Sequence, residues 1–110
     1  GSAVYAYIAL TSQGQVQVLE ALSFIGTSTF DVSLYPQEST TVQLTIANAS
    51  SVALDVDLTS SINPASKGLT VSIPNKITVP ATGQITVDIT ISASKSAEPQ
   101  AYTVAIMFDR

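Results

Sequence analysis

The chain has 110 residues, a formal net charge of −4, and 45% hydrophobic against only 11% charged residues. This length supports one hydrophobic core, and the hydrophobic content argues against disorder. Histidine and cysteine are absent, which excludes catalytic triads, histidine-based metal sites, thiol nucleophiles and disulfides, so we expect a protein that is not an enzyme and holds no cofactor or metal.

The first residues of the chain predict a strand with apolar side chains on both faces. Two tyrosines alternate with four aliphatic residues, which is the period-two pattern of a strand. Residues 11–14 (TSQG) then predict a turn. The residues of this predicted strand are Val4, Tyr5, Ala6, Tyr7, Ile8 and Leu10.

The same apolar run bears on localisation. Residues 4–10 are too few to span a bilayer and no basic segment precedes them, so we expect neither an intact signal peptide nor membrane insertion. Gly1 and Ser2 are either a cloning remnant or the mature end left by a signal peptidase. The chain has 15 Ser and 13 Thr, a polar but uncharged composition that is typical of secreted proteins. We therefore expect an extracellular or cell-surface protein whose signal peptide has been removed.

Two further strands are predicted before the first proline. Residues 15–24 predict a second strand with Val16 and Val18 facing inward. Residues 30–34 (FDVSL) alternate between apolar and polar and predict a third strand, which ends before Pro36.

Apolar alternation continues through the rest of the chain. Each run stops at Pro, Gly, Asn or Ser, and no segment has a sustained period of 3.6 residues. A strand that alternates covers a core with one face only, which is typical of antiparallel sheets. We therefore predict an all-β, immunoglobulin-like or jelly-roll-type antiparallel β-sandwich of about eight or nine short strands, with a barrel as the second choice. The later runs are 42–46, 52–58, 69–73, 77–79, 85–91 and 102–108.

Asn48-Ala49-Ser50 is an N-glycosylation sequon in a predicted turn. A glycan on Asn48 would project into solvent from such a turn. The alternative is an ordinary turn asparagine, because Asn tolerates left-handed backbone geometry.

Several side chains have the types that catalysis uses. Ser66-Lys67 and Ser94-Lys95-Ser96 contain the pair of a Ser–Lys dyad, but no motif supports a dyad and we predict polar loop residues. Asp55 and Asp57 share one strand face, where a carboxylate pair or Ca²⁺ site would also need a cleft or further oxygen ligands. We predict a solvated outer face there. A carboxylate-only enzyme would need a pocket that gathers two of Asp31, Asp55, Asp57 and Asp88.

The basic side chains argue against two classes of partner. Lys67, Lys76, Lys95 and Arg110 are scattered along the chain. No basic stripe is available to hold a phosphate backbone or an anionic lipid surface, so we expect no nucleic acid and no membrane among the partners.

Residues 30–61 and 68–110 give a layout of strands and turns that resembles the immunoglobulin-like modules of secreted prokaryotic proteins. More narrowly, it resembles the TasA/camelysin-type biofilm fibre subunits and the archaeal bundling pili. The chain departs from them in having Gln37 where such turns carry Gly after Pro36, and in its shorter length. A peptidase activity of camelysins is not carried over, because histidine is absent.

The resemblance implies a filament in which each subunit donates its N-terminal strand to the next. Burying Val4, Ile8 and Leu10 would contribute at most about 5–8 kcal/mol. Ordering eight backbone residues costs roughly 8–16 kcal/mol. Side-chain burial is therefore insufficient, and the strand must also gain a hydrogen-bond ladder and a cover for Tyr5 and Tyr7. A strand inserted into a neighbour's sheet satisfies both needs.

These observations divide the chain into a donor strand and turn, residues 1–14, and an immunoglobulin-like sandwich, residues 15–110. The expected partners are identical subunits in a homopolymer, with lateral bundling of filaments and with glycans. The alternative is that residues 3–10 complete their own sandwich. The protein would then be a monomeric or dimeric binding module for a surface layer or glycan, such as an archaeal flagellar stator-like domain.

Overall fold

The computed structural model describes residues 2–7, 11–17, 19–26 and 28–110, and in these residues the fold is all-β. The described residues contain no helix that is long and apolar enough to cross a membrane. The strands are β1 (Ser2–Tyr7), β2 (Thr11–Val16), β3 (Leu22–Ile25), β4 (Ser39–Asn48), β5 (Leu54–Asn63), β6 (Leu69–Ser72), β7 (Lys76–Val79), β8 (Gln84–Ala93) and β9 (Thr103–Asp109).

Seven of the strands form a β-sandwich of two antiparallel sheets. One sheet has the strand order β3-β4-β8-β6 and the other has the order β7-β5-β9. The longest pairing joins β4 to β8, from Ser39 opposite Ser92 to Ala47 opposite Gln84. The predicted all-β antiparallel sandwich is therefore confirmed.

The core lies between the two sheets and follows from the alternation in the sequence. In β4 and β8, successive side chains point to opposite faces, so the buried positions fall on every second residue. Ile46, Val56 and Val79 belong to one buried cluster, and Leu44, Ile89 and Ile91 form a second. Among the side chains that the structure describes, both clusters draw only on residues 22–108.

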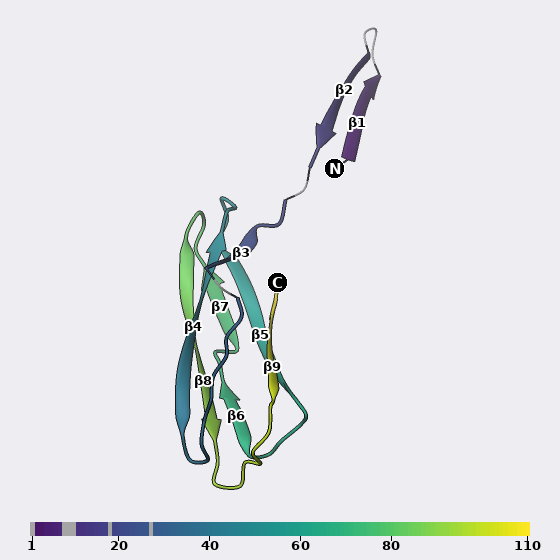
Figure 1. The fold of residues 1–110 in the computed structure, drawn as a ribbon. Coiled ribbons are helices and arrows are strands. Elements are labelled where there is room, and N and C mark those ends of the chain that lie inside the picture. Colours follow the sequence, from purple (N-terminus) through teal and green to yellow (C-terminus); the bar gives the residue numbers. More distant parts are fainter. Residues whose placement is uncertain (1, 8–10, 18, 27) are drawn as a thin grey trace.

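β1 and β2 form a separate antiparallel hairpin that joins neither sheet of the sandwich. Their register runs from Ser2 opposite Val16 to Tyr7 opposite Thr11. Figure 1 shows the hairpin extending away from one end of the sandwich, which gives the molecule extents of 75 × 25 × 21 Å. We call residues 2–16 the N-terminal arm.

Three local predictions are wrong. Residues 11–14 were predicted as a turn but belong to β2, because they pair with residues 4–7 of β1. Residues 15–24 were predicted as one strand, but β2 ends at Val16 and β3 begins at Leu22. Val16 was predicted to face inward and is 48% exposed; Val18 lies outside the described residues.

The third error concerns residues 30–34, which form no strand. Among the described residues, no backbone–backbone hydrogen bond involves residues 28–34. The apolar alternation of this segment is real, since Phe30 and Leu34 pack against the core. A strand also needs a neighbour for its ladder, and the segment has none among the residues that the structure describes.

The turn before β4 contains Gln37, at the position where the similar turns carry Gly after Pro36. Glu38 N donates to Tyr35 O at 3.1 Å, which closes a four-residue turn with Pro36 at its second position. Gln37 at the third position has φ 71°, the left-handed geometry of a type II turn, in which Gly is preferred. The turn aligns β4 with β8, because Gln37 N donates to Ala93 O at 2.8 Å.

Candidate functional site

β9 is the longest of the strands at the sheet edges of the sandwich. Within the described part of the chain, β9 pairs with β5 alone, so the backbone groups on its other side have no sheet partner. The three other strands at sheet edges, β3, β6 and β7, are four residues long, whereas β9 has seven residues. Short edge strands limit unwanted pairing, and β9 lacks this protection.

The residues of β9 also lack the usual chemical protection of an edge. The strand reads TVAIMFD, with no proline, no lysine and one charge at its last position, Asp109. Its inward residues Val104, Ile106 and Phe108 are only half-buried. Apolar, uncharged edges of this length are templates for a further strand. The sequence and the geometry of β9 therefore both favour the addition of a strand.

A groove lies beside this edge, between β9 and β3. Its volume is about 540 Å³. Phe24 of β3 and Phe108 of β9 meet edge to face across it, with ring centroids 5.4 Å apart. Phe24 stays 42% exposed, so the groove offers apolar surface to an occupant. The apolar side chains that line it are Leu22, Phe24, Ile46, Ile106, Met107 and Phe108.

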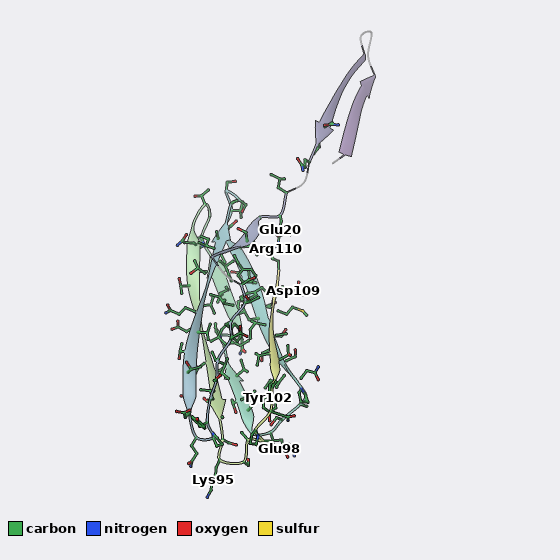
Figure 2. The ribbon with its side chains drawn as sticks, in the orientation of Figure 1. Glu20, Lys95, Glu98, Tyr102, Asp109 and Arg110 are labelled. Carbon is green, nitrogen blue, oxygen red and sulfur yellow. The ribbon has the colours of Figure 1, made fainter. Side chains whose placement is uncertain are left out.

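Charged residues line the end of the groove nearest the N-terminal arm. Arg110 Nη2 lies 3.6 Å from Glu20 Oε1, and the two side chains are 45% and 70% exposed. Figure 2 shows Glu20 and Arg110 side by side at this end, with Asp109 next to them on the strand. An ion pair this exposed contributes little to stability. This ion pair therefore lies at the end of the groove and does little to hold that end closed.

Residues 28–34 contribute apolar side chains to the same core as β9. Phe30 and Leu34 of the segment 28–34 pack against the same buried residues as Ile106 and Phe108 of β9. This segment carries the chain from β3 to the turn that starts β4, and it runs along the sandwich in Figure 1. Residues 28–34 and β9 therefore both contribute apolar side chains to the packing around this buried cluster.

The predicted donor-strand residues lie in the N-terminal arm. Val4, Tyr5, Ala6 and Tyr7 belong to β1 and pair with residues 11–14 of β2. Ile8 and Leu10 lie outside the described residues. The structure therefore places residues 4–7 in a strand that joins neither sheet of the chain's own sandwich.

Asn48, the predicted glycosylation candidate, is 2% exposed. Its Nδ2 donates to Val52 O at 2.8 Å and to Val79 O at 3.2 Å, and its Oδ1 accepts from Ser50 N at 2.9 Å and from Ser50 Oγ at 2.7 Å. Both Nδ2 hydrogens are in use, so a glycan on this atom is incompatible with the folded arrangement. Asn48 acts as a structural turn residue that joins the end of β4 to the turn before β5 and to β7.

The residues considered for catalysis do not converge. Ser66 Oγ accepts from Gly68 N at 3.1 Å, and Ser94 Oγ lies 3.1 Å from Ser96 Oγ, so both serines act within their loops. Asp55 accepts from Thr78 on one sheet, whereas Asp88 accepts from Gln43 on the other. The described residues contain no group of three or more acidic side chains placed to hold a metal ion.

Sequence reasoning missed the groove and identified only the arm. The missed signal was the composition of residues 103–109, an apolar final strand without lysine or proline. No protein-family model matches the sequence, and no curated protein is significantly similar to it.

Proposed function

We propose that this protein is the structural subunit of an extracellular filament, in which the N-terminal arm of each subunit occupies the groove of the next. The observation that carries the proposal is the free edge of β9 beside an apolar groove, on a sandwich whose own arm lies elsewhere. The arm's strands have six residues each, which matches the seven of β9. This is strand addition to an exposed sheet edge.

The strand orders support an immunoglobulin-like sandwich that lacks its last strand. Such domains have the order A-B-E-D in one sheet and C-F-G in the other. β3-β4-β8-β6 corresponds to A-B-E-D in both space and chain order, while β5 and β9 correspond to C and F. The place of strand G, next to β9, is then vacant within the described chain. The short strand β7 is an addition on the other side of β5.

The stability and composition of the arm also support the proposal. An isolated two-stranded hairpin is at best marginally stable in water, so β1 and β2 need a further partner to persist. By sequence, the arm is apolar on both faces of its first strand, from Val4 to Tyr7. A neighbour's groove would cover one face and the backbone edge of β9 would supply a ladder. The same event would remove the exposed edge of β9, a hazard for uncontrolled aggregation.

Electron microscopy of the full chain tests the proposal. We expect filaments under negative stain, and we expect a chain lacking residues 1–17 to give discrete particles with the same far-ultraviolet circular dichroism. Filaments that persist in the shortened chain would contradict donation by the arm. Discrete particles from the full chain would favour the alternative, a monomeric or dimeric binding module.

A further inference from the structure

We infer that residues 28–34 form the second half of the acceptor site and become a strand only when a second copy's arm is in place. β1 of the arm would then separate from β2 and lie between β9 and residues 28–34, hydrogen-bonded on both of its sides. This inference rests on the proposed function, since it names the residues that the donated strand contacts. Residues 28–34 would supply a second hydrogen-bond ladder, which the groove between β9 and β3 does not supply.

The sequence of residues 28–34 predicts a strand, but the isolated chain forms no strand there. FDVSL alternates as a strand does, yet no described backbone partner exists for residues 28–34. Phe30 and Leu34 are half-buried, while Val32 between them is 41% exposed. On a strand these three side chains share one face, so Val32 would be covered by a neighbour that is missing. A local preference that the fold leaves unused is expected at a functional site.

Residues 28–34 also pack against the same core residues as β9 does. Phe30 and Leu34 pack against the buried cluster of Leu44, Ile89 and Ile91, and so do Ile106 and Phe108 of β9. Residues 28–34 and β9 thus share one part of the core, and we infer that a strand added to β9 has this segment as its second neighbour. Two ladders instead of one help to offset the entropy of ordering the arm, which burial of the arm's side chains does not cover by itself.

The chain directions of β9 and of residues 28–34 also allow a strand between them. β5 runs from Leu54 to Asn63 antiparallel to β9, and residues 28–34 lead from β3 down to the turn that opens β4. The segment and β9 are thus antiparallel to each other (Figure 1). A strand that enters antiparallel to β9 is then parallel to residues 28–34. Parallel and antiparallel ladders can flank one strand in a mixed sheet, so this arrangement is allowed.

Hydrogen exchange and a pair of proline variants of the full chain test this inference. Asp31→Pro and Val32→Pro change neighbouring exposed residues, and neither removes a backbone hydrogen bond of the unassembled chain. Neighbouring residues of a strand direct their backbone N–H groups to opposite sides. If residues 28–34 pair with the arm, the variant that removes an N–H directed at the arm should raise the critical concentration for filament assembly about tenfold more than the other variant does.

The exchange data separate the inference from the function on which it rests. We expect amides of residues 28–34 and of β9 to exchange more slowly in filaments than in dispersed chains, with β4 and β8 protected in both as a control for folding. Filaments that protect β9 but leave residues 28–34 at the dispersed rate, with both proline variants assembling normally, would overturn the inference alone. Failure to form filaments, or an unprotected β9 within them, would overturn the proposed function as well.

Discussion

At the scale of single residues, Asn48 shows how one side chain joins two strands, β4 and β7, and the turn between β4 and β5. Its amide group contacts backbone atoms of Val52 and Val79 and both polar groups of Ser50. The sequence predicted the turn at this position but left open whether Asn48 carries a glycan. Burial and the occupied Nδ2 hydrogens are tertiary features, because Val79 lies 31 residues further along the chain.

We expect Asn48→Ala to lower the free energy of unfolding by about 2–4 kcal/mol, because it leaves buried carbonyl groups without a donor. Urea denaturation of the unassembled chain measures this effect. Ser50→Ala is the matched control, since it also removes the sequon but keeps Asn48, and it should cost about 1 kcal/mol. Equal and small effects of the two variants, or a glycan found on Asn48 by mass spectrometry, would contradict the structural role.

The turn at Gln37 gives a prediction of opposite sign. A non-glycine residue in left-handed geometry costs roughly 1–2 kcal/mol, part of which glycine loses again through its freedom in the unfolded chain. We expect Gln37→Gly to raise the free energy of unfolding by about 0.5–1 kcal/mol, as thermal or urea denaturation would measure. A destabilised Gln37→Gly variant would show that the glutamine side chain makes a compensating contribution.

At the scale of elements, the sequence predicted most of the sandwich. The strands from β4 to β9 alternate cleanly and end at proline, glycine or polar turns, so local pattern is sufficient to locate them. The local pattern was insufficient to predict the structure of residues 11–14, 15–24 and 30–34. In each case the outcome depended on whether a partner strand was available, which is a non-local property. The groove was not predictable for the same reason, since it is bounded by β3 and β9, which belong to different sheets and lie far apart in the sequence.

The edge of β9 and the groove beside it can be tested with Phe24. This side chain is 42% exposed and meets Phe108, so Phe24→Ala should cost only about 1–2 kcal/mol of stability while it removes part of the groove surface. We expect the critical concentration for assembly, measured by sedimentation, to rise about tenfold.

Val52→Ala provides the control for that variant. Val52 is 65% exposed and does not line the groove, so its truncation removes exposed apolar surface elsewhere. It should leave assembly unchanged. If both variants weakened assembly to the same extent, the groove between β3 and β9 would not be the acceptor.

At the scale of the whole molecule, the arm and the sandwich are complementary halves of one contact. A chain lacking residues 1–17 keeps the groove and all the core residues that the structure describes. It should therefore bind a donated arm but offer none in return. We expect this shortened chain, added below equimolar amounts, to shorten filaments of the full chain in electron micrographs. Filaments of unchanged length would indicate that the groove accepts no arm.

The central claim is that the arm pairs with β9 of another copy and not with β9 of its own chain. The absence of native cysteine allows disulfide trapping without background. Ala105 is exposed on β9, so Ala105→Cys can be combined in turn with Val4→Cys, Tyr5→Cys, Ala6→Cys and Tyr7→Cys on the arm. A disulfide forms only where the two Cβ atoms come within about 4.5 Å.

We predict that at least one of these pairs gives, after mild oxidation, a ladder of covalent oligomers at multiples of 11.4 kDa on a non-reducing gel. Each single-cysteine variant should give no species larger than a dimer. A disulfide confined to the monomer would contradict the account, because it would place the arm in the groove of its own chain.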